Sequence, residues 1–125
     1  MKWVLDDSMS IWPQLKKQMM RAIVSGEFPE GSVFPTVRQL AQEAGVNRNT
    51  MQRAMAELEA EGLLITNRTA GRTVTADQQL IGQMKRTLAE ENIQKYLEEM
   101  KALGYRPGEA AQMLNEKVEE EGITV

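Results

Sequence analysis

Residues 36–53 read TVRQLAQEAGVNRNTMQR. Thr36 can cap a helix with its hydroxyl, and Gln39 stands three residues further on, where it completes a capping box. Gly45 can end this helix, and Asn47 can cap a second helix after a short turn. Two short helices joined by a glycine turn predict a helix-turn-helix, a motif that places its second helix in the major groove of DNA.

The second of these helices, expected to reach about Glu61, has two chemically different faces. Its apolar residues recur at helical spacing and should point inward; they are Met51, Ala54, Met55 and Leu58. Its opposite face carries Arg48, Asn49, Gln52 and Arg53. Arginine can bind guanine through two hydrogen bonds, and asparagine or glutamine can bind adenine in the same way. Any one of these residues could simply cover the solvated side of an amphipathic helix, but the ordered set favours the reading of DNA bases.

A β-hairpin follows this helix. Residues 63–66 and 72–75 predict its two short strands, and residues 67–71 predict the turn between them. Arg68 and Arg72 flank a tip of small residues, which suits contacts with phosphates or entry into the minor groove.

A further helix precedes these elements. Ser10 can cap it, residues 11–25 show helical periodicity, and Gly26 ends it; residues 27–35 then predict a loop with one short extended piece. The order helix, helix, glycine turn, helix, hairpin is that of a winged helix-turn-helix. We therefore expect a mainly α fold with a small β-hairpin.

Several motifs at fixed spacing resemble the N-terminal domain of the GntR family of bacterial transcription regulators. They are IWPQL (11–15), AIVSG (22–26), FPTVRQLA (34–41), GVNRNTMQRA (45–54), LEAEGL (58–63) and GRTV (71–74), and together they cover about residues 10 to 75. The resemblance implies a winged helix that binds operator DNA as a dimer. It also implies DNA contacts from Arg38, Arg48, Asn49, Thr50, Gln52 and Gly71.

At two positions the sequence departs from the pattern of that family. Two threonines are also expected to contact DNA. The wing of the family usually reads Gly-x-Gly, and Thr69 takes the place of the first glycine here. Gln52 stands where some relatives have arginine, which shifts the preferred base from guanine toward adenine. Thr36 and Thr50 lie near helix N-termini, where we expect them to hold phosphates.

The chain divides by pattern into a DNA-binding domain at residues 1–75 and a helical arm for dimerisation at residues 76–125. Thr75, with Gln78 three residues on, is expected to cap the first arm helix, and a second runs from about Pro107 to Glu121. Residues expected to meet a second chain are Leu80, Ile81, Met84, Leu88, Ile93, Leu97, Met100, Met113 and Leu114.

Within the arm, the second helix should bury Ala110, Ala111, Met113, Leu114 and Val118. Because two helices cannot bury both apolar stripes against each other, a second copy is the simplest cover, although the arm could instead pack back on its own domain. In length and pattern the arm resembles the YtrA-like subfamily.

Composition narrows the classes of function. The chain has 125 residues, no cysteine and no histidine, so the usual zinc ligands and the usual general base are missing, and we expect no metal and no cofactor. The acidic pairs Glu57–Glu61 and Glu116–Glu120 could bind metal or act in catalysis, but they read better as solvated faces. We therefore expect no enzyme activity.

The charge is unevenly distributed along the chain. Residues 1–76 carry three Lys and six Arg against eight acidic residues, a net of +1, and residues 77–125 have a net of −4. This split hints at one face for nucleic acid and one kept away from it, although a mixed-sign solvated surface would look similar. No segment predicts a membrane span or a secretory signal, so we expect the cytoplasm.

These observations predict a sequence-specific DNA-binding regulator of the repressor type that binds a palindromic operator as a homodimer. The alternative is a winged helix used as a protein-interaction module without DNA. Most of the nine methionines fall on inner stripes and should fill the core rather than form a ligand surface. The sequence shows no inducer pocket and leaves open whether a small-molecule effector binds.

Overall fold

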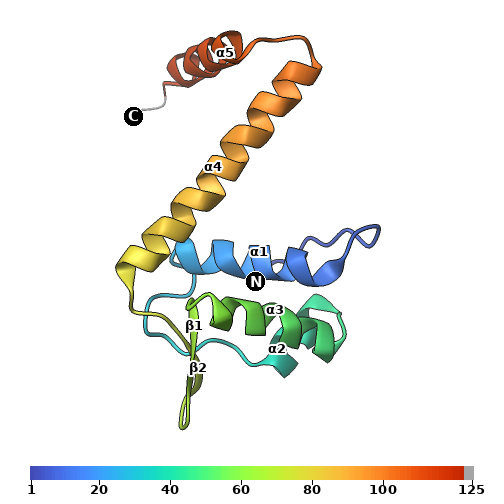
Figure 1. Cartoon of the computed structure of the whole chain (residues 1–125), viewed down its shortest axis with the longest axis vertical. Helices are drawn as coiled ribbons and strands as arrows, with labels where there is room; N and C mark the ends of the chain where they lie inside the picture. Colours follow the sequence, from blue (N-terminus) through green and yellow to red (C-terminus); the bar gives the residue numbers. More distant parts are fainter. Residues whose placement is uncertain (123–125) are drawn as a thin grey trace. The chain divides into compact units, whose positions relative to one another are not determined.

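The computed structural model describes residues 1–122, and its fold confirms the predicted mainly α architecture with a small hairpin (Figure 1). In chain order the elements are α1 (Ile11–Val24), α2 (Val37–Ala44), α3 (Arg48–Ala60), β1 (Leu64–Asn67), β2 (Gly71–Val74), α4 (Gln78–Ala102) and α5 (Pro107–Glu120). The chain forms two compact units, one of residues Met1–Arg86 and the other from Thr87 onward. We call them the winged-helix unit and the C-terminal unit.

The start of α2 and that of α3 follow the predicted capping chemistry. The Gln39 backbone N–H donates to Thr36 Oγ1 at 3.1 Å, and the Thr36 backbone N–H donates to Gln39 Oε1 at 2.9 Å. Gly45 ends α2 with a φ of 70°, in the left-handed region that favours glycine. The Asn49 N–H donates to Asn47 Oδ1 at 2.7 Å at the start of α3. These two caps fix where the turn between the helices begins and ends.

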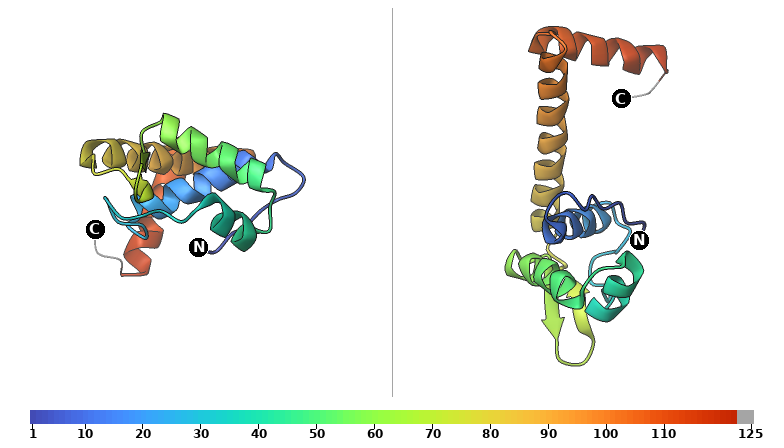
Figure 2. Two further views of the ribbon diagram at one scale, coloured as in Figure 1. Left: turned by 90° about the horizontal axis from the view of Figure 1, so that it is seen from below. Right: turned by 90° about the vertical axis from the view of Figure 1, so that its right-hand side faces the viewer.

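The core of the winged-helix unit is formed by all three of its short helices and the hairpin. Figure 2 shows α1 and α3 packed side by side with α2 beside α3. Its largest fully buried side chains are Leu15, Met19, Leu40, Met51, Met55, Leu58, Leu63, Leu64 and Val74. The predicted inner face of α3 is therefore confirmed, including Ala54. Burial of these side chains holds α3 so that its polar face stays exposed.

The wing is an antiparallel hairpin whose strands are each shifted by one residue from the prediction. Its pairs run from Leu64 opposite Val74 to Asn67 opposite Gly71. The predicted short extended piece in the preceding loop is confirmed, because Val33 forms an isolated bridge with Thr73. The wing is thus anchored on both sides, to α3 through β1 and to the loop before α2.

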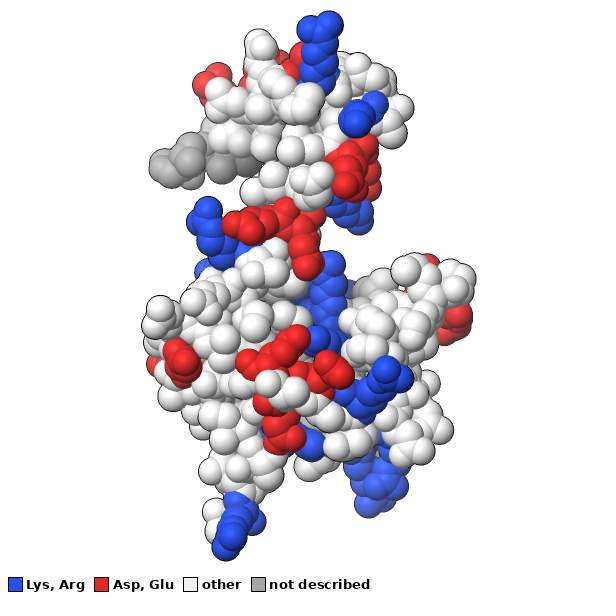
Figure 3. Space-filling model, viewed as in Figure 1, with Lys and Arg blue, Asp and Glu red and all other residues white. Residues whose placement is uncertain are grey.

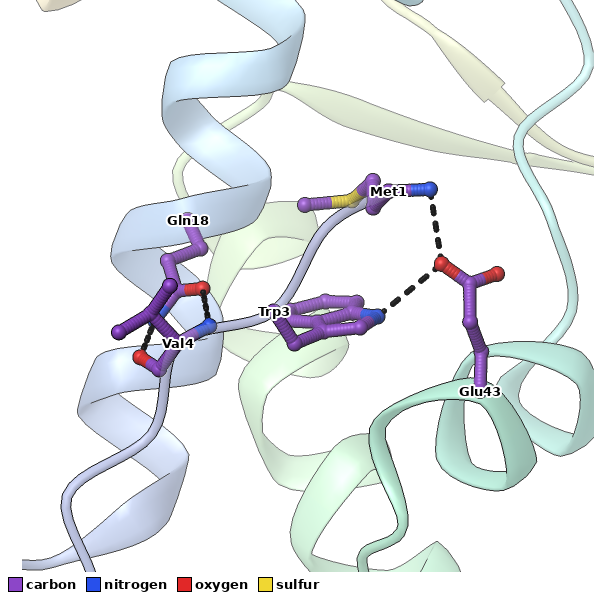
Figure 4. A network of polar contacts seen from close by, with 5 residues as sticks. All are labelled: Met1, Trp3, Val4, Gln18 and Glu43. Atoms are coloured by element: carbon purple, nitrogen blue, oxygen red, sulfur yellow. Dashed lines mark hydrogen bonds and ion pairs between the residues drawn. The ribbon is translucent and has the colours of Figure 1, made fainter.

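An N-terminal segment, residues 1–10, ties α1 to α2 and was not foreseen in the sequence (Figure 4). The Val4 backbone pairs with the Gln18 side chain of α1 through bonds of 3.0 and 2.6 Å. The Trp3 Nε1–H donates to Glu43 of α2 at 3.2 Å, and the Met1 ammonium lies 2.7 Å from the same carboxylate. Hydrogen bonding to that ammonium holds the pKa of Glu43 below its ordinary value.

The predicted cap of α4 is wrong by two residues. The Leu80 N–H donates to Asp77 Oδ1 at 3.1 Å, so Asp77 caps the helix. Thr75 is buried, and its own N–H donates to the Leu63 carbonyl at 2.9 Å. Because Thr75 extends the hairpin pairing in this way, α4 begins only at Gln78.

The apolar residues of α4 form two stripes rather than the single predicted one. Leu80, Ile81 and Met84 pack against the core of the winged-helix unit, and Leu80 lies so close to Gly62 that a Cβ there would be 3.2 Å from Leu80 Cδ2. The next large apolar residue after Leu88 is Ile93, and five residues turn a helix by about 140° beyond a full turn. The stripe continued by Ile93 therefore lies on a different face of the helix.

The C-terminal unit leaves much of its apolar surface exposed. Tyr96 donates its hydroxyl to the Ala110 carbonyl at 2.8 Å, and Ala110 is buried. Ala111 is exposed, and Met113 and Leu114 are 39% and 51% exposed, so the prediction that α5 buries them is wrong for the single chain. The physical reason is that only one narrow side of α5 meets α4.

Across residues 1–122, no helix is long and apolar enough to cross a membrane.

Candidate nucleic-acid interface

A groove of about 690 Å³ lies where α2, α3 and the wing converge. It is lined by Val33, Phe34, Pro35, Thr36, Val37, Arg38, Gln39, Arg48, Thr66, Ala70, Gly71 and Arg72. Three of these residues are arginines and none is acidic, so the groove is suited to a polyanion. Figure 3 shows basic side chains at the tip of the hairpin and along the lower edge of the view.

A second, shallower hollow adjoins the groove. Its lining is Val37, Asn47, Arg48, Asn49 and Gln52, and it shares Val37 and Arg48 with the groove. The two hollows therefore form one continuous surface, which we call the reading surface. It combines arginine with the amide side chains of asparagine and glutamine, the groups that bind base edges in the major groove.

Two helix N-termini open onto the reading surface. Thr36 precedes α2 and Arg48 is the first residue of α3, and both line the groove. The first turn of a helix has unpaired N–H groups and the positive end of the helix dipole, which together favour phosphate. The Thr36 hydroxyl oxygen accepts the capping bond from Gln39, so its own O–H stays available as a donor.

The structure brings together most of the predicted DNA-binding residues. Those on the reading surface are Thr36, Arg38, Arg48, Asn49, Gln52, Gly71 and Arg72. The other three lie elsewhere on the winged-helix unit. Thr50 is half-buried and lines a neighbouring hollow with Leu5 and Asp7. The Arg53 guanidinium lies over the Trp12 ring, and Arg68 is exposed at the wing tip.

Arg72, which the sequence places beside the wing tip, contacts α3 in the structure. It shares a strand face with the buried Val74, because alternate residues of a strand point to the same side. Its side chain is only 20% exposed, and its Nε lies 3.9 Å from Glu59 Oε1 on α3. That Nε is buried and has no hydrogen-bond partner. Arg72 therefore reaches the groove from beside α3 rather than from the tip of the wing.

The acidic pair Glu57–Glu61 has a structural partner. Lys16 of α1 lies 2.6 Å from Glu61 Oε1 and 3.9 Å from Glu57 Oε2. Within residues 1–122, no group of three or more acidic side chains converges on a point where a metal ion could bind. The pair joins α1 to the end of α3, and this accounts for its helical spacing.

Comparison with known proteins decides the family. The profile of the family described as bacterial regulatory proteins, gntR family, matches residues 13–74. The regulator YhcF of Bacillus subtilis is 31% identical over 97 residues, which span 78% of this chain and 80% of that protein. The repressor YtrA of the same organism is 32% identical over 96 residues, or 77% of this chain and 69% of YtrA. The chain belongs to the gntR family.

Solved structures agree with this assignment. A gntR-family regulator from Listeria monocytogenes is 31% identical, with a TM-score of 0.80 over 90% of this chain and 98% of that one. The DNA-binding domain of AraR, solved with an operator, covers 60% of this chain with a TM-score of 0.50 and 26% identity. The expected gntR membership of the YtrA-like type is confirmed. The chain is a winged-helix transcription regulator, and its relatives are regulators rather than enzymes.

The wing tip of this gntR regulator accommodates its unusual threonine without strain. Among the described residues, only glycines have a positive φ, so Thr69 takes an ordinary backbone conformation. Gly71 has a φ of 76° and supplies the left-handed residue of the turn. Thr69 therefore replaces the first glycine of Gly-x-Gly without strain, and the positive φ that requires a glycine is at Gly71.

Some residues of the reading surface were not foreseen in the sequence. The sequence indicates Asn47 only as a cap, yet it also lines the shallower hollow. Val33 and Thr66 line the groove, and their contribution depends on the bridge and register of the wing. The contact of Glu59 with Arg72 could not be predicted, because nothing in the local pattern links two residues that are thirteen positions apart. Only for Asn47 did the sequence carry a signal, namely its place directly before Arg48.

Proposed function

We propose that this gntR regulator binds an inverted-repeat operator as a homodimer and represses transcription in the cytoplasm. The observation that carries the proposal is the reading surface, which joins the starts of α2 and α3 to the wing and is lined by arginines without any acidic residue. Arg48, Asn49 and Gln52 read bases in the major groove. Thr36 and Arg38 hold phosphates at the start of α2.

The remaining predicted contacts come from the wing and from the edge of this surface. Arg68 and Gly71 bring the wing to the backbone or the minor groove, and Arg72 contributes a cation from the side of α3. Thr50 and Arg53 stay in the proposed contact set as residues at its edge, because each lies against another part of the winged-helix unit.

The homodimer is proposed from the apolar surface of the C-terminal unit. Ile93, Leu103 and Leu114 are 57%, 74% and 51% exposed, and apolar side chains of this size are normally covered. Of the predicted interface residues, Leu80, Ile81 and Met84 already pack within the winged-helix unit and Leu88 is buried. We therefore centre the interface on Ile93, Leu97, Met100, Met113 and Leu114.

The boundary between the two functions follows from the same observations. We keep a DNA-binding part and a dimerisation part, but we place the boundary after Arg86, where the compact units divide, rather than after residue 75. Residues 123–125 of the predicted arm lie outside the described residues. Two winged-helix units on a twofold axis can place their α3 helices in successive major grooves, roughly 34 Å apart.

Repression is proposed from the relatives. YtrA and NagR of Bacillus subtilis are named as repressors, although the match covers only 37% of NagR. A dimer seated on an operator that overlaps a promoter blocks polymerase by occupying the same DNA. An effector that lowers operator affinity remains part of the proposal, with no site assigned to it.

A selection experiment tests the proposal. The full chain is used to select duplexes from a random-sequence pool, and we expect an inverted repeat that binds two protomers. Inserting five base pairs between the half-sites should abolish tight binding, because half a helical turn rotates the second site to the opposite side of the DNA. Recovery of no preferred sequence would contradict sequence-specific binding and favour a protein-interaction module.

A further inference from the structure

We infer that Glu59 is a positioning residue for DNA binding: it holds the Arg72 side chain so that its two terminal nitrogens face the groove and bind a DNA phosphate. The inference rests on the proposed function, because it assigns one further residue to the same interface. Glu59 does not line the reading surface and carries the wrong charge for contact with DNA.

The geometry of the pair supports this role. Glu59 approaches Arg72 through the inner nitrogen, with 3.9 Å between Glu59 Oε1 and Arg72 Nε. Both side chains are partly shielded, at 33% and 20% exposed, so their attraction is screened less than that of a surface pair. The contact with Glu59 involves the inner Nε, and Arg72 lines the groove beside Arg38 and Arg48.

The backbone around Arg72 is fixed independently of Glu59. The Phe34 N–H donates to the Arg72 carbonyl at 2.8 Å, and Arg72 stands opposite Thr66 in the hairpin. Glu59 therefore has little influence on the position of the wing strand itself. What it controls is the direction of a long side chain that would otherwise sample many rotamers, and an arginine fork binds phosphate best when it is already oriented.

The consequence is an effect of unusual sign. A carboxylate near a DNA-binding surface repels phosphates, so its removal ordinarily strengthens binding. If Glu59 orients Arg72, its neutralisation weakens binding instead. The two effects oppose each other, and the sign of the measured change shows which one dominates.

The test measures the affinity of full-length variants for the duplex recovered by the selection, at several salt concentrations. Glu59→Gln keeps the size of the side chain and removes its charge, and we expect about three- to tenfold weaker binding. Arg72→Ala should lower the magnitude of the salt slope by about one unit, as one lost phosphate contact does. In the Arg72→Ala background, Glu59→Gln should cause no further loss or a small gain, because only the repulsion remains to be removed.

Glu57→Gln is the matched control. Glu57 lies two residues earlier on α3, faces Lys16 at 3.9 Å and does not line the groove. Removing its charge should leave DNA affinity unchanged or raise it slightly. Arg72→Lys is a second variant: it keeps the positive charge but lacks the inner Nε and the fork, and it should bind more weakly than the parent protein.

Each outcome of these measurements either supports or overturns the positioning role of Glu59. Glu59→Gln binding as tightly as the parent, or more tightly, while Arg72→Ala binds more weakly, overturns the positioning role and leaves the proposed function intact. If Glu59→Gln fails to fold, parental affinity of Arg72→Lys overturns the inference, since any cation would then suffice. If the parent protein selects no duplex and binds none from the random pool, the proposed function fails and the inference fails with it.

Discussion

The guanidinium of Arg53 lies 4.3 Å from the centre of the Trp12 ring and so joins α3 to α1. A cation above an aromatic face is stabilised by the negative potential of the ring. This contact turns Arg53 away from Arg48 and Gln52, which line the reading surface. The polar face of α3 is therefore divided between the reading surface, where we propose that DNA binds, and the helix beneath it.

Arg53→Ala should lower the stability of the protein more than its affinity for DNA. The lost cation–π contact is partly exposed and should cost about 0.5–1 kcal/mol in the free energy of unfolding. Denaturant melts and operator titrations on the same variant measure the two effects separately. A loss of operator affinity as large as that of Arg48→Ala would show that Arg53 moves to the DNA on binding.

Arg48→Ala should instead lower the affinity for DNA more than the stability of the protein. Arg48 is exposed, is the first residue of α3 and lines both hollows of the reading surface. We expect it to cost about 1–3 kcal/mol in operator binding and to relax specificity at one position of each half-site. Titrations against the operator and against variants with single base changes measure this. An equal loss on operator and on random DNA would mean that Arg48 holds phosphate rather than a base.

The predictions for the wing concern its contacts with DNA phosphates rather than the recognition of bases. Arg68 is exposed at the tip, so Arg68→Ala should reduce the magnitude of the salt slope by about one unit without affecting folding. Thr69→Gly should change affinity only modestly, because Thr69 already has an ordinary φ and Gly71 supplies the turn. Unchanged slopes for Arg68→Ala and Arg72→Ala together would remove the wing from the interface.

Local signals in the sequence were sufficient for the winged helix. The capping box of Thr36 and Gln39 and the inner face of α3 each depend on residues three or four apart, and the structure has them as predicted. The caps locate the start of both helices, and with them the residues that surround the groove. This is why the sequence places Arg48 and Gln52 on the exposed face at the start of α3, whereas Arg38 is indicated only by the resemblance to the gntR family.

Long-range contacts account for what the sequence did not reveal. The pairing of Arg72 with Glu59 depends on which face of β2 meets α3, and that face is set by the register of the wing. The cap of α4 moved to Asp77 because Thr75 pairs with Leu63 across the hairpin. The residue spacing within one segment predicts neither of these contacts, because each contact depends on how two separate segments pack against each other.

If the proposed homodimer forms through the C-terminal unit, Leu114→Glu should yield a folded monomer. Leu114 is already 51% exposed in the single chain, so a charge there costs little folding energy but cannot be buried against a second copy. Asn115→Glu adds the same charge at an exposed neighbouring position and serves as the control. Light scattering gives the mass of each variant. A Leu114→Glu protein that remains dimeric would place the interface elsewhere.

Two truncations test where the DNA-binding part ends. A chain of residues 1–86 retains Leu80, Ile81 and Met84, which cover the core of the winged-helix unit, and it should fold as a monomer with weak operator binding. A chain of residues 1–75 loses these three side chains, and because each is about half-buried we expect it to be less stable by about 2–4 kcal/mol. Thermal melts and light scattering compare the two. Equal stability would mean that the first turns of α4 add nothing to the core, and an intact dimer of residues 1–86 would remove the C-terminal unit from the proposed interface.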